Sequence, residues 1–451
     1  MPVAPNLSLG AHRANGDRFL PVQPLWDHGA ILAAVTIPAV ETEPACPGAT
    51  DRASTSPDPD ATAGVARSAG PLVAVRRAFG DIPQEVWDGL AARSPWATPF
   101  AAWAFHRAWW DAYGATAHDQ TLVVVEAAQA ANPAAPPVAI VPLMHRHEVE
   151  PIDEATHTTM RHAHGSPLTA VEPTATAVFF GATYHADYAT VLGAPVDLPA
   201  VAEAVVAHLA HVADPRMEAD PARWDVVDLR RLRCGDPATD ALVAAFRRVV
   251  DRERWQVTIE REDVCPVITF PHGVDFDGYL GTLDKKERHE IRRKVRRAEA
   301  AGEVRLVASS QPLADLDEFI DLHQKRWGAD GLFPNTPGGE CSRRFFRHLF
   351  RHFGPDGPAK LTRLMIGDRV VASGIHFDDG TRIAYYNAGV DPDARDLSPG
   401  VVMVAEYVKQ AIEGGRVAMD FLRGNEPYKY QWGAVDEPIQ RILVSRTGDT
   451  A

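Results

Sequence analysis

Apolar and polar residues along the second half of the chain predict strands and helices in close succession. The apolar run Val417–Leu422 has the length of a buried strand, and Arg382–Val390 has the same character upstream of it. A helix is expected between them, from Pro399 to about Gly414, because Ser398 is a natural N-cap and a Gly-Gly pair ends the helix. Functional residues tend to lie where such strands end.

The first half of the chain predicts a second folded unit between Pro71 and about Arg254, in which strands and helices alternate as in an α/β layer arrangement. Its expected elements are a helix around Trp96–Tyr113, strands at Thr121–Glu126 and Val138–Met144, a helix at Leu198–Val212 and a strand at Trp224–Leu229. No strict repeat is visible, but the last of these strands follows its helix much as Val417–Leu422 follows its own.

Composition divides the chain into a tail and two domains. At 451 residues, with 45% hydrophobic and 24% charged residues, the chain can bury more than one core. Residues 1–70 are predicted to be a disordered tail or linker, because Glu41–Gly70 is rich in Pro, Ala, Thr, Ser and Asp. Two domains are then expected, at residues 71–255 and 256–451.

Several absences in the sequence favour a cytoplasmic protein without a membrane span or a metal. No run reaches the roughly 18 apolar residues of a span, and Met1–Asn15 lacks the order of a secretory signal. The four cysteines lie far apart without CxxC spacing, which indicates a reducing compartment and neither a disulfide framework nor a zinc site. Histidines gather between His145 and His164, but they have no carboxylate or cysteine partners at ligand spacing, so metal binding there is a minor hypothesis.

The segment Leu283–Arg297 concentrates positive charge in a protein whose formal net charge is -14. Apolar residues at 291, 295 and 298 recur at helical spacing, so one face packs and the others carry cations. Two interpretations stay open: a solvated helix held by pairs of opposite charge, or a phosphate-binding helix. The candidate phosphate ligands are Arg292 and Arg296.

The densest group of functional side chains is Asp420–Gly433, which reads DFLRGNEPYKYQWG and crowds carboxylates, cations and aromatics behind a predicted strand. One interpretation is an aromatic-rich turn that packs over a sheet while Arg423 and Lys429 are solvated. The other is a binding or catalytic site.

Five motifs in a fixed order support the second interpretation. They are KKERHEIRRKVRRAEAAG, LHQKRWG, YYNAGVDP, SPG and DFLRGNEPYKYQWGA. In this order the chain resembles the bacterial acyltransferase domain of the CelD type, a GNAT superfamily domain related to the FemAB peptidyltransferases, over roughly Asp275–Val444. The resemblance implies an α/β (α+β) fold with two tandem GNAT-like domains, each a mixed twisted sheet flanked by helices. It further implies that the first domain is degenerate and that the acceptor binds between the two.

The resemblance also implies where the donor binds. The thioester would lie where two central strands splay apart, with its carbonyl on the backbone of Tyr385–Gly389, so that Tyr386 and Asn387 are cofactor-binding candidates. Its pyrophosphate would lie at Ser398, Pro399 and Gly400, although only Gly400 remains of the glycine-rich signature of ordinary GNAT enzymes. The YKYQWG segment is similar to the aromatic-Lys-x-x-Phe-Gly pattern of FemAB proteins, which implies that Lys429 stabilises the acyl group or its phosphate-bearing carrier.

Acyl transfer to an amine also needs a proton acceptor and donors for the developing oxyanion. The candidate acceptors are Asp420, Glu426, His376 and His323, and the sequence does not rank them. Asp420 lies in an apolar strand, so it must pair with a cation such as Arg423 or have a raised pKa, and it is equally a candidate for a buried strut. Tyr428, Tyr385 and Tyr386 are candidates to protonate the thiolate, although aromatics in strands are more often core.

The remaining candidates concern the substrate. Trp327 would wall the cleft together with Phe333, and residues 181–193 are a candidate acceptor loop. The full set of substrate-binding candidates is Trp327, Arg423, Trp432, Asp187 and Tyr188.

The leading function is therefore an N-acyltransferase that moves an acyl group from acyl-CoA to an amine of a small metabolite or cell-envelope precursor. Acyl-CoA would be a co-substrate and no cofactor would be tightly bound. A FemAB-like transferase that uses aminoacyl-tRNA is the second choice, since the basic helix suits RNA as well. A non-catalytic adaptor that retains the fold is the third. The oligomeric state stays open.

Overall fold

A computed structural model of the protein describes residues 70–146, 168–172, 174–183, 185–214, 216, 220–328 and 331–446. The predicted tail at 1–70, apart from its last residue, lies outside the described residues, as do the histidines at 147–164. Two sheets organise the rest. The smaller one is antiparallel and has the order β1 (Leu72–Arg76), β3 (Leu122–Glu126), β4 (Ala139–Val141) and β7 (Leu192–Gly193).

The larger sheet is mixed and has eleven strands. Its order is β10 (Val304–Ala308), β11 (Ala359–Ile366), β12 (Arg369–Asp378), β13 (Arg382–Val390), β14 (Ala418–Asp420), β9 (Trp255–Thr269), β15 (Val435–Arg446), β8 (Val226–Arg233), β6 (Ala177–Phe180), β5 (Leu143–Arg146) and β2 (His118–Asp119). Two neighbouring pairs are parallel, β13 with β14 and β6 with β8. Each pair is joined through a helix, so both halves of the chain contain a parallel pair with a crossover, α10 (Pro399–Glu413) in one and α4 (Leu198–Ala213) in the other.

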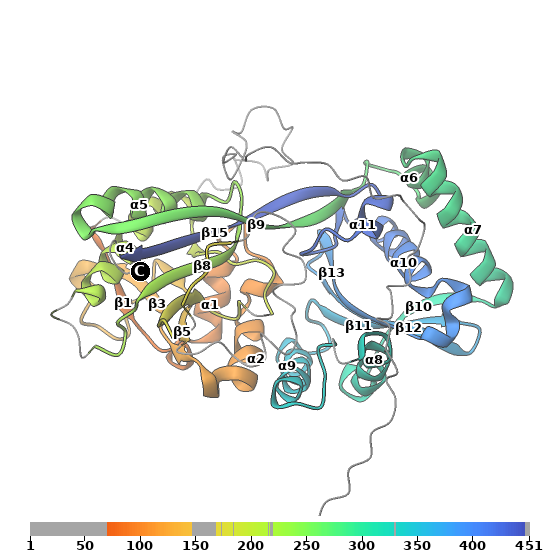
Figure 1. Cartoon of the computed structure of the whole chain (residues 1–451), viewed down its shortest axis with the longest axis horizontal. Coiled ribbons are helices and arrows are strands. Elements are labelled where there is room, and N and C mark those ends of the chain that lie inside the picture. The colour runs from red at the N-terminus through yellow and green to blue at the C-terminus, as the bar shows by residue number, and fades with distance from the viewer. Residues whose placement is uncertain are drawn as a thin grey trace, which may run out of the picture. The chain divides into compact units, whose positions relative to one another are not determined.

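Strands β9 and β15 carry the sheet from one half of the chain to the other. They pair antiparallel from Val435↔Val267 to Arg446↔Trp255, and Figure 1 shows them as the two longest strands. The end of β9 continues onto β14, and β15 continues onto β8. The predicted boundary at residues 255/256 falls at the start of β9, so strands from both sides of it share one sheet.

Helices cover the sheets on both faces, which confirms the predicted α/β class. They are α1 (Gln84–Ala91), α2 (Trp103–Tyr113), α4, α5 (Pro237–Glu253), α6 (Phe276–Thr282), α7 (Lys285–Ala301), α8 (Pro312–Trp327), α9 (Pro337–Phe353), α10 and α11 (Pro427–Gln431). The predicted helix around Trp96 starts later, at Trp103, because Pro99–Ala101 forms a separate 3-10 turn. The predicted strand Val138–Met144 is two strands in different sheets, β4 and β5, divided at Pro142, which has no N–H for a ladder.

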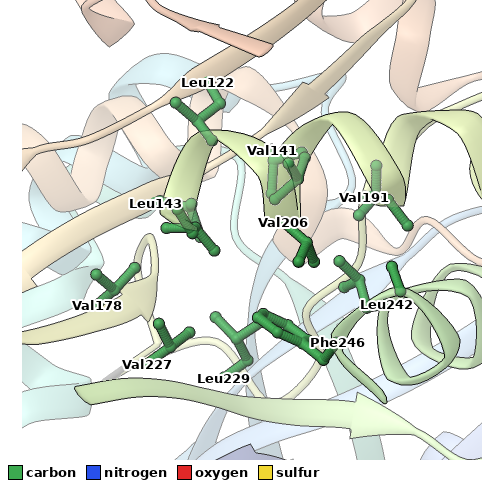
Figure 2. Close-up of a cluster of buried hydrophobic side chains, with 14 of the residues drawn as sticks. Leu122, Val141, Leu143, Val178, Val191, Val206, Val227, Leu229, Leu242 and Phe246 are labelled. Carbon is green, nitrogen blue, oxygen red and sulfur yellow. The ribbon is translucent and has the colours of Figure 1, made fainter. Parts of the chain in front are cut away.

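The core of the first half lies between the two sheets. Figure 2 shows Leu122 and Val141 of the small sheet facing Val227 and Leu229 of β8, with Phe246 of α5 between helix and sheet. By length and composition the helix at Pro195–Ala213, which includes α4, could cross a membrane, but 56% of that apolar window is buried inside the protein. Because its apolar residues belong to this core, α4 has the character of a core helix.

The sheet of the second half has separate cores on its two faces. Helices α7 and α10 pack on one face, while α8, α9 and α2 pack on the other. Gly389 of β13 allows α8 to approach closely, since a Cβ there would lie 2.4 Å from the backbone nitrogen of His323. On the opposite face, apolar residues of the basic helix α7 share a core with α10, so α7 lies beside α10, as Figure 1 shows.

The cysteines depart in part from the prediction. Cys265 and Cys341 are free thiols, whereas Cys234 is disulfide-bonded.

Candidate active site

Strands β13 and β14 diverge soon after they meet. Their parallel pairing covers three positions, Arg382↔Ala418, Ile383↔Met419 and Ala384↔Asp420. Beyond the last pair β13 continues through Tyr385–Val390, paired with β12 on its other edge, where the register shifts at Tyr386 as in a β-bulge. This divergence, here called the wedge, leaves one edge of β13 without a strand partner among the residues that the structure describes. The predicted cofactor-binding residues Tyr386 and Asn387 lie along it.

Helix α10 starts next to a cation of α7. Ser398 is at the N-cap in the left-handed region (φ 54°, ψ 49°), and its carbonyl accepts from the amides of Val401 and Val402 at 3.0 and 3.1 Å. Its side chain makes no cap hydrogen bond, contrary to the expected role. Instead the hydroxyl accepts from the Arg297 guanidinium at 3.2 Å. Positive charge therefore lies at a helix N-terminus, which is the arrangement that favours an anion.

The start of α10 is also open. A Cβ added at Gly400 would meet no atom within 4 Å, so there is space at the first turn for a ligand to approach. Arg297, which the sequence did not single out, is the α7 cation that contacts this helix start. The predicted phosphate ligand Arg292 pairs with Asp277 at 2.8 Å, and Arg296 is exposed on the same helix. Their phosphate-binding role stays a prediction.

Asp420 lies at the point where the wedge opens, because it is the last residue of β14 that pairs with β13. Its side chain is 4% exposed. One carboxylate oxygen accepts from the Tyr188 hydroxyl and the other from the Leu422 amide, both at 2.7 Å. Burial raises the pKa of Asp420 to about 6, and the charge of Glu437 adds to the rise. A carboxyl group with such a pKa is suited to exchange protons near neutral pH.

The matching aspartate of the first half has a different environment. Asp228 lies on β8, the second strand of the other parallel pair, and is fully buried. Burial raises its pKa, but the charges and hydrogen bonds of Arg230 and Arg441 more than offset this and hold the pKa below its ordinary value. Asp228 is thus fixed as an ion-paired strut, whereas the side chain that hydrogen-bonds to Asp420 is a neutral tyrosine.

Two residues of the candidate acceptor loop contact the candidate site of the second half. The Tyr188 hydroxyl donates to Asp420, and Asp187 pairs with Arg423 through Nε at 3.3 Å. These contacts join positions more than 230 residues apart in sequence. The sequence left two alternatives for Asp420, an ion pair with Arg423 or a raised pKa. Arg423 pairs with Asp187 instead, and the pKa of Asp420 is raised.

Lys429 is committed to the loop that follows β14. Its side chain is 2% exposed, and the ammonium group donates to the carbonyls of Leu422, Arg423 and Gly424 at 2.9–3.0 Å. It also pairs with Glu426 at 2.9 Å. Because Leu422 has a positive φ of 56°, the loop needs such a tie. These contacts are those of a positioning residue, and direct catalysis by Lys429 or Glu426 stays a prediction.

Aromatic side chains line both faces of the wedge. On the α10 face, the Phe421 ring lies 6.4 Å from Tyr385 and 5.9 Å from Tyr428, and burial raises the pKa of Tyr428 well above its ordinary value. On the opposite face the Tyr386 hydroxyl donates to the carbonyl of His185 at 2.9 Å. Trp432 is buried at 2% exposure, so any contact with substrate would need the loop to open.

The other predicted residues lie farther along these elements. Trp327 ends α8, is 40% exposed and lies under the Arg326 guanidinium at 4.7 Å from the ring centroid. His323 is buried with its ring 5.1 Å from Phe333, as a core histidine would be. Burial lowers the pKa of His376 to about 4, and its ring packs on Tyr407. Of the four candidate proton acceptors, the structure brings Asp420 to the wedge opening.

A cavity of about 390 Å³ lies at the other end of β13, between Asp88, Asp356 and Asp379. Three of its four aspartates have partners in the protein: Asp88 accepts the Trp103 amide, Asp378 pairs with Arg416, and Asp379 accepts backbone amides. The wedge is defined instead by strand divergence, and this cavity is not part of it.

Comparison with known proteins identifies the class of this fold. Residues 285–430, from the start of α7 into α11, match the family described as Acetyltransferase (GNAT) domain. This segment contains β13, α10 and β14. The second half of the chain therefore carries a GNAT acetyltransferase domain, the type of domain that catalyses acyl transfer.

The solved structures that the chain matches are distant from it in sequence, and their TM-scores lie below 0.5. A conserved protein of unknown function from Bacteroides thetaiotaomicron shares 12% identity and a TM-score of 0.48, covering 81% of this chain and 98% of its own. FemX is 12% identical, with a TM-score of 0.47; the match covers 80% of this chain and 96% of FemX. A tandem GNAT protein from the clavulanic acid biosynthesis pathway is 11% identical, with a TM-score of 0.41; the match covers 84% of this chain and 100% of that protein. No curated protein matches the chain.

Proposed function

We propose that the protein is an N-acyltransferase that takes an acyl group from acyl-CoA and transfers it to an amine of a small metabolite or cell-envelope precursor. The observation that carries this proposal is the wedge with Asp420 at its opening and the start of α10 beside it. A thioester between β13 and β14 would have backbone donors along one side, and its pyrophosphate would reach Gly400 and Arg297.

The proposed reaction uses the two sides of the wedge differently. The amine nitrogen attacks the thioester carbonyl, and the β13 backbone stabilises the oxyanion that forms. The Asp420 carboxylate accepts the proton that the amine loses, directly or through the Tyr188 hydroxyl. The C–S bond then breaks, and the CoA thiolate leaves and takes up a proton. With a pKa of about 6, Asp420 is mostly ionised at pH 7.5 and can act as the acceptor.

The acceptor amine is proposed to enter from the side of the first half of the chain. Tyr188 and Asp187 come from that half and contact Asp420 and Arg423. This would place the amine between the two halves. Because the matching carboxylate Asp228 is ion-paired with arginines, only the second half would carry out the chemistry.

The test is release of free CoA thiol from acetyl-CoA in the presence of a panel of primary amines. We expect amine-dependent release that falls at least about 100-fold in Asp420→Asn, the lower bound for loss of a general base. Asp317→Asn, an exposed aspartate of α8 that pairs with Arg347 of α9, is the control and should keep full activity. Release that Asp420→Asn leaves unchanged would refute the proposed role of Asp420.

One observation favours a second candidate donor, aminoacyl-tRNA. Helix α7 presents exposed cations to solvent, among them Lys285, Lys286 and Arg296. No ion pair with a described residue is found for these three. RNA binding would engage several phosphates, so its affinity would fall much more steeply with salt than that of acyl-CoA. Activity with charged tRNA and none with acyl-CoA would replace the first proposal with this one. Activity with neither would favour the non-catalytic adaptor.

A further inference from the structure

Two histidines and an aspartate meet between helices α2 and α9, away from the wedge. His348 and His352 lie one turn apart on α9, with rings nearly parallel at 14° and centroids 5.9 Å apart. Asp111, in the last turn of α2, points one carboxylate oxygen at both. The three side chains are 17–23% exposed, so the group is accessible from solvent but held by its surroundings.

The distances in this group suit a small metal ion. The Oδ2 atom of Asp111 lies 2.7 Å from Nε2 of His352 and 3.6 Å from Nδ1 of His348. Two ligands at about 2.1 Å from a tetrahedral ion lie about 3.4 Å apart, which falls between those values. All three donor atoms lie within 4.8 Å of one another. Small side-chain rotations would therefore bring them to one centre.

The surrounding side chains hold two of the ligands in place. Asp111 pairs with Arg107 through its other oxygen, Oδ1, so Oδ2 keeps its direction toward the histidines. The Trp103 ring stands edge-on to His352 with centroids 6.0 Å apart. Such supporting contacts are what orient metal ligands in proteins.

Positive charge nearby counts against a cation, and each source of it has another partner or room to move. Arg107 is bound to the far oxygen of Asp111. Arg344 donates to the carbonyl of Ala112 at 3.0 Å. Arg351 lies 3.3 Å from Nδ1 of His348 but is solvent-exposed, so it can swing away when an ion enters.

We propose that Asp111, His348 and His352 bind one divalent transition-metal ion, Zn²⁺ or a similar ion, with water in the fourth position. Two imidazoles and a carboxylate form a ligand set that such ions favour over Mg²⁺ or Ca²⁺. The ion would join α2, from the first half of the chain, to α9, from the second. The site is independent of the proposed acyl transfer.

The test is direct metal binding by the full-length protein without a histidine tag. Calorimetric titration with Zn²⁺ is expected to give one site per chain, and Co²⁺ should give the visible absorption of a low-symmetry four-coordinate ion. Loss of even an outer partner of a metal ligand weakens binding about 10- to 100-fold. His352→Gln and His348→Gln should therefore each weaken Zn²⁺ binding by at least about tenfold.

The control is His289→Gln, which changes an exposed histidine on α7 and should bind Zn²⁺ as the wild type does. Melting curves without metal show whether each variant is folded, and the Co²⁺ spectrum of the wild type tests the site without any substitution. Wild-type protein that binds no Zn²⁺ or Co²⁺ at 100 µM would overturn the proposal. So would binding that both α9 variants retain in full.

Discussion

Replacing Asp420 by asparagine is expected to make the protein more stable at pH 8. Burial raises the pKa of this carboxyl from 3.8 to about 6, so the folded state binds its proton more tightly than the unfolded state does. The stability that this group contributes is fully present below pH 3.8 and is lost as the pH rises through about 6. A shift of about two pH units corresponds to about 3 kcal/mol. An asparagine side chain stays neutral at every pH, so the variant does not lose this free energy as the pH rises.

The assay is guanidinium unfolding of wild type and Asp420→Asn at pH 4.5 and pH 8. The variant should gain up to about 3 kcal/mol at pH 8 and much less at pH 4.5, where the wild-type carboxyl is largely protonated. Asparagine can still accept the Leu422 amide, so the loop should keep its conformation. A variant that is less stable than the wild type at pH 8 would refute the reasoning, since it would mean that the ionised carboxylate is a strut.

Three further outcomes follow from the contacts at the wedge. Tyr188→Phe removes a hydrogen bond that lowers the pKa of the neighbouring carboxyl, so the acid limb of the pH–rate profile should move up from about pH 6, by roughly one unit. Arg297→Gln should weaken acetyl-CoA binding several-fold in calorimetry, with a smaller loss at high salt, while Arg305→Gln on β10 should leave it unchanged. Lys429→Met leaves three carbonyls without their donor, so the free energy of unfolding should fall by at least about 3 kcal/mol, measured as a lower midpoint of unfolding. Unchanged stability with lost turnover would instead support direct catalysis by Lys429.

The elements of the fold were largely predictable because local signals set them. The strand Arg382–Val390 and the helix from Pro399 have the predicted bounds, since apolar periodicity, a proline in the first turn and a glycine pair act within a few residues. The insertion of β15 between β9 and β8 was not predictable. It depends on pairing between strands far apart in the chain, for which one sequence carries no signal.

The same contrast holds for the site. The segment around Asp420 was recognisable from its dense functional side chains, and its raised pKa was one of two stated possibilities. The contact of Asp420 with Tyr188 was not foreseen, although both residues were named, because it is made only in the folded chain. Arg297 was missed among many cations of α7, since its neighbour Ser398 lies 101 positions away.

The most direct test of the donor site is calorimetric titration of acetyl-CoA into wild type and Gly400→Val. A Cβ at this position meets no atom within 4 Å apart from its chain neighbours and the backbone of its own helix, so the fold should be unchanged, but a valine side chain would occupy the approach to the first turn of α10. We expect saturable binding by the wild type and at least about tenfold weaker binding by a variant with the same melting temperature. Equal binding by both proteins, or no binding to the wild type at millimolar acetyl-CoA, would contradict it.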